Sequence, residues 1–482
     1  MANKLRISKI GLCLISLMFV GCKTVPAPRL QDLSTPKKTR SGLKINDNLR
    51  DFSHDKWWER MHDPVLNRLM KEALINNNQL NVAQANIFQA QAKLKEAQFA
   101  WIPTFSASGN GFLGRTWDSH FTPQGALAQS SALSKLGTIH FQGLFSGFVP
   151  SYSLNILENI NLNKRAKASL DMQRAVYNAT RLSIISQISG AYFMLIGQRT
   201  QLHEQSQLIT DLKKSHQLEL IRFKDGASDL VTVTNLEQQI TSSQASISAI
   251  ENSISQIENA IQLLINRNPG PILTHRNINT LSVKGLIPAN LPSAVLKNRP
   301  DVIIAEDDLK IAGANVGIAY SSFFPAISLT GLLGRTSVDL SNLLKLHTGL
   351  ALVQAGLSLP IFNGVAYEQI NEAKAGYSAA YFSYAQTIRA VFADVNNSLT
   401  NQQKMNEAFV YQLKSYRAAK RAYNLALSSY EAGAKDYRVV ANAQLNVDQA
   451  KLNLTLAKMQ QLDSIVEVYQ ALAGGYQTNI DG

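Results

Sequence analysis

Proline is missing from two long stretches of this chain of 482 residues. None lies between Ser151 and Asn268, and none follows Pro360. Because proline breaks a helix interior, its absence over such lengths predicts long helices in both stretches. Between Pro269 and Pro325, by contrast, there are six prolines, both ends included, which predicts a junction of short elements.

Residues that carry catalytic or metal chemistry are also scarce. The eight histidines form no HExxH pair, and no phosphate loop or nucleophile elbow occurs. The run Gly109–Gly114 fits GxGxxG, but it lies in a predicted strand instead of opening a crossover helix. The net charge is +13, yet the basic residues do not cluster with aromatic ones, so we expect no nucleic-acid partner. We therefore expect no enzyme, no metal site and no cofactor apart from a covalent lipid.

The lipid is expected at the second of only two cysteines. A basic start is followed by an apolar run, Ile10–Val20, that is too short to span a membrane as a helix, and then by Gly21 and Cys22. This pattern resembles a bacterial lipoprotein signal, with residues 1–21 removed and Cys22 lipidated. A plain secretory signal with an incidental cysteine is the alternative. Residues 22–56, rich in Pro, Lys, Thr and Ser, predict a flexible tether.

The rest of the chain contains one long pattern twice. Seven small or turn-forming residues recur at a constant offset: Ala83, Ala90, Ala92, Ala97, Pro103, Ser106 and Gly109 match Ala305, Ala312, Ala314, Ala319, Pro325, Ser328 and Gly331. We predict a first structural repeat over residues 57–270, a linker over 271–290, a second repeat over 291–475 and a tail over 476–482.

Each repeat is expected to hold a long helical hairpin, over residues 160–267 in the first and 365–473 in the second. Between Leu236 and Leu264 apolar residues recur in steps of three and four, a heptad seam typical of coiled helices. The matching positions Gly226 and Gly433 are predicted turns, and Asp229 and Asp436 are predicted N-caps of the returning helices.

Each repeat is also expected to hold a β-hairpin, over residues 104–153 and 326–361. From Ala351 to Leu359 apolar residues alternate with others, as in a strand that crosses a bilayer. Four such strands cannot close a barrel, and open sheet edges are not tolerated in lipid. Two chains would supply eight strands and a filled interior, whereas three would supply twelve and leave room for passage. The fold class is therefore mixed α and β, with four transmembrane strands from each chain in a shared barrel that continues into helices.

The chain resembles the TolC-like outer-membrane factors, in the lipoprotein branch that serves resistance-nodulation-division (RND) efflux pumps. The resemblance rests on the runs Asn298–Asp301 and Leu359–Gly364, and on Trp58 with Asp63 and Pro64. It implies a homotrimer with a twelve-stranded barrel in the outer membrane and a helical barrel in the periplasm, docked to a periplasmic adaptor and an inner-membrane pump.

The resemblance also implies a periplasmic aperture just after the hairpin glycines. Counting from Gly226 and Gly433 gives Thr232, Val439 and Asn442, which are uncharged where relatives often carry acids. Asp229, Asp436 and Arg438 are the nearby charges, for which helix capping or solvation is the alternative role.

The resulting hypothesis is an efflux outer-membrane lipoprotein that passively conducts small toxic compounds out of the cell. A type I protein-secretion conduit of the same fold is the first alternative. A non-conducting periplasmic coiled-coil spacer is the second, although a spacer needs no lipid-facing strands.

Overall fold

A computed structural model describes residues 45–46, 54–115, 140–274, 276–283, 291–292, 298–337 and 349–477. The predicted signal peptide, Cys22, most of the tether and the last residues of the tail lie outside this set. None of the helices in the described ranges has the length and the apolar run needed to cross a membrane.

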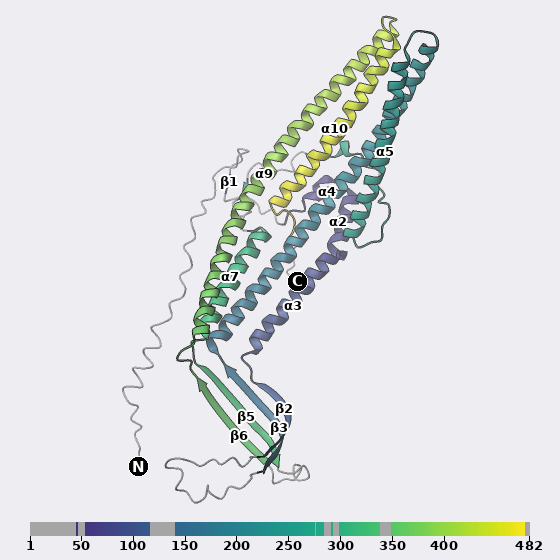
Figure 1. Ribbon diagram of the computed structural model, residues 1–482. Coiled ribbons are helices and arrows are strands. Elements are labelled where there is room, and N and C mark those ends of the chain that lie inside the picture. Colours follow the sequence, from purple (N-terminus) through teal and green to yellow (C-terminus); the bar gives the residue numbers. More distant parts are fainter. Residues whose placement is uncertain are drawn as a thin grey trace, which may run out of the picture.

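The molecule is elongated, with a small sheet at one end and two long helical hairpins at the other (Figure 1). The duplication appears as a repeated order of elements, helix, two strands and two long helices. In the first copy these are α3 (Asn78–Phe99), β2 (Thr104–Arg115), β3 (His140–Leu154), α4 (Ile156–Lys224) and α5 (Leu230–Leu264). In the second they are α7 (Pro300–Ser321), β5 (Ala326–Ser337), β6 (Gly349–Ser358), α9 (Gly364–Glu431) and α10 (Tyr437–Ala471).

The helices pack side by side in the order α3, α4, α7, α9 near the sheet and α5, α4, α10, α9 toward the hairpin tips. The predicted heptad seam of α5 is its less exposed face, and Leu236 and Ile240 pack against a cluster formed by Leu208 and Leu212 of α4 and Leu452 of α10. Helix α3 and helix α5 therefore lie at one edge of the protomer, and α9 lies at the other.

The main hydrophobic core lies midway along the molecule, where the short elements η1 (Trp57–Met61), α2 (Pro64–Asn76) and η3 (Ile278–Thr280) cover α4 and α10. Trp57 stacks on Tyr469 with ring centroids 4.6 Å apart. Asp63 is fully buried, caps α2 and accepts a hydrogen bond from the Tyr192 hydroxyl at 2.8 Å. The Trp58 and Asp63–Pro64 motif thus belongs to a structural cap.

The expected linker and the expected tail both contain buried residues. Ile272 and Ile278, in the expected linker, are buried, and so is Tyr476, the first residue of the expected tail. The Tyr476 hydroxyl donates to the backbone carbonyl of Asn298 at 2.6 Å. Tyr476 therefore helps to hold the chain just before α7 in place.

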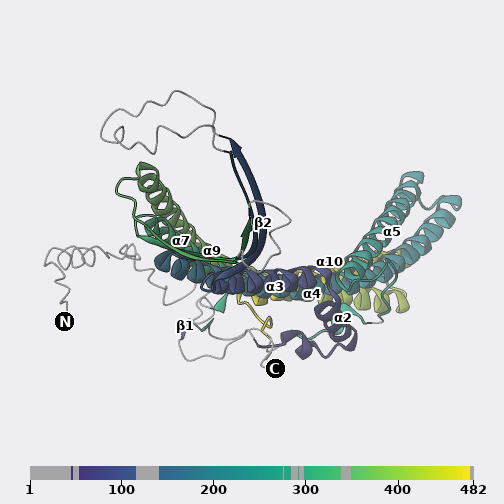
Figure 2. The same cartoon turned by 90° about the horizontal axis from the view of Figure 1, so that it is seen from below.

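The four long strands form one antiparallel sheet in the order β2-β3-β5-β6, so the two predicted hairpins join through β3 and β5. Figure 2 shows its strands strongly curved. A separate two-residue parallel pair joins β1 (Ile45–Asn46), inside the predicted tether, to β4 (Leu291–Pro292), which lies ahead of α7.

Candidate functional site

The two faces of the four-stranded sheet have different chemistry. Strand register places Ala107, Phe148, Leu333 and Ala351 in one row on the first face. On the opposite face one row is polar and is formed by Thr104, Ser151, Thr330 and Gln354. The neighbouring row on that face is mixed, because it pairs Ser106 with Val149 and Leu332 with Leu352. Large side chains of the first face are exposed: Phe148 to 63%, Leu333 to 51%, Val353 to 78% and Leu357 to 73%. An apolar face opposite a more polar one is typical of strands that lie between lipid and a water-filled lumen.

The outer edges of β2 and β6 pair with no strand in the described part of the chain. Their backbone N–H and C=O groups would cost several kcal/mol each if they faced hydrocarbon unpaired. The sheet therefore suits a membrane only if other strands complete it.

The opposite end of the molecule is formed by the tips of the two helical hairpins. Gly226 and Gly433 have φ angles of 74° and 70° and lie directly after the C-terminal ends of α4 and α9. Glycine adopts this left-handed conformation without the strain that a Cβ brings. Both positions are thus sharp turns at the tips.

The two predicted capping aspartates begin the returning helices. Asp229 accepts hydrogen bonds from the Thr232 backbone N–H at 2.7 Å and from the Thr232 hydroxyl at 3.2 Å. Asp436 accepts from the Arg438 backbone N–H at 2.9 Å. Asp229, with Thr232, caps the start of α5, and Asp436 caps the start of α10. Val439 and Asn442 lie exposed on α10, one turn apart.

An ion pair links the two hairpins at their tips. Arg222, in the last turn of α4, places Nη1 2.5 Å from Oδ2 of Asp436. The Arg438 backbone N–H and the Arg222 guanidinium together lower the pKa of the Asp436 carboxyl. Buried Glu219 supports the same turn, because it accepts a hydrogen bond from the Ser228 hydroxyl at 2.6 Å.

Arg222 and Glu219 were not predicted from the sequence. The expected aperture residues were counted forward from the hairpin glycines, while Arg222 precedes Gly226. Its counterpart in the second repeat is Ser429, so the duplication gives no signal for it.

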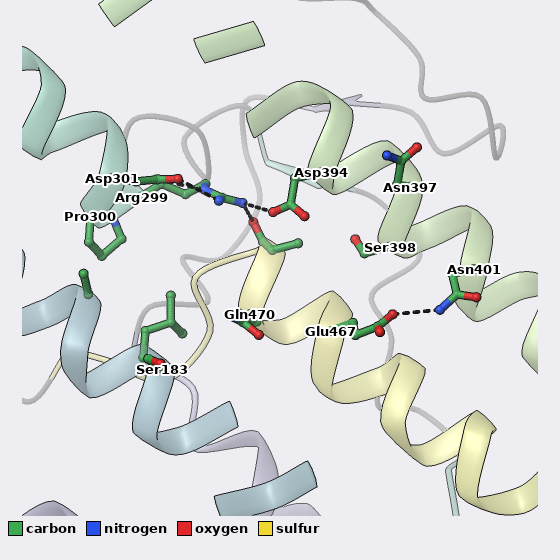
Figure 3. Close-up of a pocket in the computed structure, with 13 residues that line it drawn as sticks. Ser183, Arg299, Pro300, Asp301, Asp394, Asn397, Ser398, Asn401, Glu467 and Gln470 are labelled. Atoms are coloured by element: carbon green, nitrogen blue, oxygen red, sulfur yellow. Dashed lines mark hydrogen bonds and ion pairs between the residues drawn. The ribbon is translucent and has the colours of Figure 1, made fainter. Parts of the chain in front are cut away.

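A third feature is a cavity of about 570 Å³ between α4, α7, α9 and α10 (Figure 3). Arg299 lies on its wall and binds Asp301 through two hydrogen bonds of 3.0 and 2.8 Å. The same guanidinium donates to Asp394 of α9 at 2.8 Å and to the Ala471 carbonyl at 2.6 Å. The Asn298–Asp301 motif therefore ties the start of α7 to α9 and to the end of α10.

The family model of the outer membrane efflux proteins matches residues 69–267 and 291–474, which together make up most of the chain. The chain belongs to the outer membrane efflux protein family. Each matched stretch covers one copy of the duplicated pattern. Membership of this family agrees with the observed architecture, one sheet with an exposed apolar face joined to a long layer of helices.

Relatives and solved structures agree with this assignment. Over 97% of its length the chain is 27% identical to the probable efflux pump outer membrane protein TtgC of Pseudomonas putida, of which it covers 96%. It is 24% identical to the cation efflux system protein CusC of Escherichia coli K12 over 82% of this chain and 83% of CusC.

Among solved structures, the outer-membrane channel OprN superposes with a TM-score of 0.78 at 22% identity, over 93% of this chain and 99% of OprN. The open state of the MtrE channel of Neisseria gonorrhoeae gives 0.76 at 24%, over 92% and 98%. The predicted fold class is therefore confirmed. This efflux protein is an outer-membrane protein whose helices extend into the periplasm.

Proposed function

We propose that three copies of this chain form one closed tunnel, a passive conduit for small toxic compounds across the outer membrane. The observation that carries the proposal is the sheet with two unpaired edges and an exposed apolar face. Three copies supply twelve strands, enough for a barrel with an open lumen, in which β6 of each copy pairs with β2 of the next.

The helical edges support the same arrangement. Helix α9, at one edge, exposes Phe382 to 69%, Tyr411 to 66% and Leu425 to 70%. Helix α3, at the other, exposes Val82 to 61% and Phe88 to 59%. Exposed apolar side chains at both edges of an elongated protomer favour burial against neighbouring copies. The tunnel would then continue from the barrel into a ring of helices.

The conduit would receive its cargo from a periplasmic adaptor and an inner-membrane pump of the RND type. The relatives are named for the export of toluene, of antibiotics and of cations, and these names favour small-molecule efflux over polypeptide secretion. The Arg222–Asp436 pair joins the two hairpins of one protomer at their tips, which favours the tips as the aperture that a pump assembly would widen. A lipid on Cys22 would anchor the chain to the outer membrane in addition to its strands.

Deletion of the gene tests the function directly. We expect greater sensitivity to several small toxic compounds, restored by the wild-type gene. Purified protein should also conduct ions across planar lipid bilayers. Unchanged sensitivity to a broad panel, together with no bilayer current, would contradict the conduit function.

A further inference from the structure

The duplication of the sequence is also a duplication of helix packing. One groove lies between α3 and α4, and a larger one lies between α7 and α9. The offset that carries Pro103 to Pro325 carries three α3 residues that line the first groove onto α7 residues that line the second: Asn86, Ala90 and Lys93 onto Asp308, Ala312 and Asn315. The offset of the long helices, which carries Tyr177 to Tyr384, likewise carries Ser169 of α4 to Gly376 of α9. Helix α3 therefore packs on α4 as α7 packs on α9.

The packing of α7 on α4, which joins the two repeats, has an equivalent that one protomer cannot form. By the same offsets, α4 corresponds to α9 and α7 corresponds to α3. Within a protomer, however, α3 and α9 lie at opposite edges of the helical layer (Figure 1). Only α3 of a second copy can therefore take the place on α9 that α7 takes on α4.

The strands give an independent check of this equivalence. The two hairpins share one register, because equivalent residues pair in both: Thr104 with Ser151, and Ala326 with Ser358. Applying the β3–β5 register to β6 and to β2 of the next copy pairs Ala355 with Gly111 on the apolar face. It pairs Ser358 with Ser108 on the opposite face. The sheet thus keeps its two faces across the join, which a slip by one residue would exchange.

Opposite charges occupy equivalent positions at the two helical edges. Within a protomer, Asn161 of α4 lies so close to Gly317 of α7 that a Cβ at Gly317 would collide with the Asn161 amide. The offsets carry Asn161 to Glu368 of α9 and Gly317 to Lys95 of α3. Both charged side chains are exposed, and within the described ranges neither forms an ion pair. Glu368 accepts a 3.3 Å hydrogen bond from the Asn371 amide of its own helix.

The apolar residues near these charges fit the same packing. On the face of α4 that meets α7, Ala168 and Ala175 are buried, whereas their equivalents on α9, Ala375 and Phe382, are exposed. Helix α7 runs toward the sheet and α4 runs away from it, so α3 and α9 of neighbouring copies would also be antiparallel. Phe88, one heptad before the lysine, would then lie opposite Ala375, one heptad after the glutamate. A large exposed side chain would thus meet a small one.

We propose that Lys95 forms an ion pair with Glu368 of the neighbouring copy, at the point equivalent to the contact of Gly317 with Asn161. Two long side chains need more room than glycine and asparagine, so α3 and α9 lie farther apart there than α7 and α4. The pair joins unlike edges, whereas α3 against α3, or α9 against α9, would bring like charges together. It therefore selects the head-to-tail contact that a closed ring requires. This inference rests on the proposed ring of copies and names the contact that sets its register.

A zero-length cross-link tests the contact in the full-length protein in isolated outer membranes. A carbodiimide joins a lysine amine to a carboxylate when the two form an ion pair. We expect mass spectrometry to find Lys95 linked to Glu368, and a denaturing gel to show two and three linked chains. K95Q and E368Q should each lose this link. The matched controls K93Q and E372Q, at groove-lining positions of the same two helices, should keep it.

Charge reversal is a second measurement, and it needs no cross-linker. K95E and E368K should each lower the fraction of multimer that survives a fixed heating step in detergent by about fivefold, the upper value for an exposed ion pair. The swap K95E/E368K restores opposite charges and should return that fraction toward the wild-type level. High salt should lower the wild-type fraction as well, because it screens exposed pairs.

The ion pair and the ring of copies would fail in different ways. A multimer without a Lys95–Glu368 link, or a swap as unstable as either reversal, would overturn the ion pair and leave the ring in place. A wild-type protein that stays a single chain would overturn both.

Discussion

Single residues decide how the two hairpins of one protomer are held together. Arg222 and Asp436 join them at the tips, next to glycines whose positive φ angles make the turns possible. The pair is partly exposed, so solvent screening keeps it weak. An ion pair this weak can help to keep the aperture closed at rest and still break when a partner protein docks.

The first prediction concerns this pair. Asp436→Lys should place two cations together and favour separated tips, shifting the aperture equilibrium by up to about fivefold toward the open form. Asp229→Lys should act in the same direction, because it removes the cap of α5. The measurement is uptake of a bulky antibiotic that intact outer membranes exclude.

The swap R222D/D436R is the matched control, because it restores the pair with the charges exchanged. Uptake should return toward the wild-type level. If D436K leaves uptake unchanged, the resting aperture is closed by other residues.

At the scale of elements, the contacts between helices differ in character. Apolar side chains dominate the contact of α5 with α4 near Leu236 and Ile240, and the Arg199–Glu258 ion pair joins the same two helices farther along. Helices α4 and α10 instead bring buried polar groups together, among them Glu204, Asp448 and Thr455. Burial, and the nearby Asp211 of α4, raise the pKa of the Asp448 carboxyl to about 6. Burial likewise raises the pKa of Glu204. These carboxyls make the packing of α4 on α10 dependent on pH.

The second prediction follows from the sign of the Asp448 shift. A carboxyl whose pKa is higher in the folded state than in the unfolded state stabilises the fold when protonated. That contribution is complete below pH 4 and is lost as the pH rises through 6. Asp448→Asn should therefore raise the free energy of unfolding by about 1–2 kcal/mol at pH 7.5 and have little effect at pH 4.

Thermal unfolding at the two pH values measures this difference. The control is Asp171→Asn, a half-exposed aspartate that pairs with Arg174. An equal effect of D448N at both pH values would show that the benefit does not arise from titration.

The third prediction concerns the contact between β3 and β5, the strands that join the two repeats. A Cβ added at Gly147 would lie 2.4 Å from the Cα of Gly334 and from the Leu333 carbonyl oxygen, which are backbone atoms that cannot turn aside. Gly147→Val should therefore separate these strands and reduce the yield of assembled protein in the outer membrane. Gly349→Ala, where nothing lies within 4 Å, should assemble normally in the same heat-modifiability gel.

The helices, strands and turns could be predicted from the sequence because the patterns that indicate them are local. The missing prolines predicted the long helices, and alternation from Ala351 to Leu359 predicted β6. Gly226 and Asp229 predicted the turn between α4 and α5. Non-local contacts carry no such signal. Nothing near Arg222 in sequence points to Asp436, and nothing in the expected linker shows that Ile272 and Ile278 enter the core.

At the scale of the whole molecule, the isolated protomer is incomplete. Its sheet has an apolar face and two unpaired edges, and its helical layer exposes large apolar side chains at both sides. In lipid this surface is stable only when strands of other copies close the sheet. Family membership places the protein in the outer membrane. The unpaired sheet edges and the exposed apolar side chains of the helical edges favour a closed ring of copies.

The number of copies in that ring is therefore the most direct test. Native mass spectrometry of the complex, extracted from outer membranes without heating, should give the mass of three mature chains. A stable single chain, or a complex of two, would contradict the shared twelve-stranded tunnel.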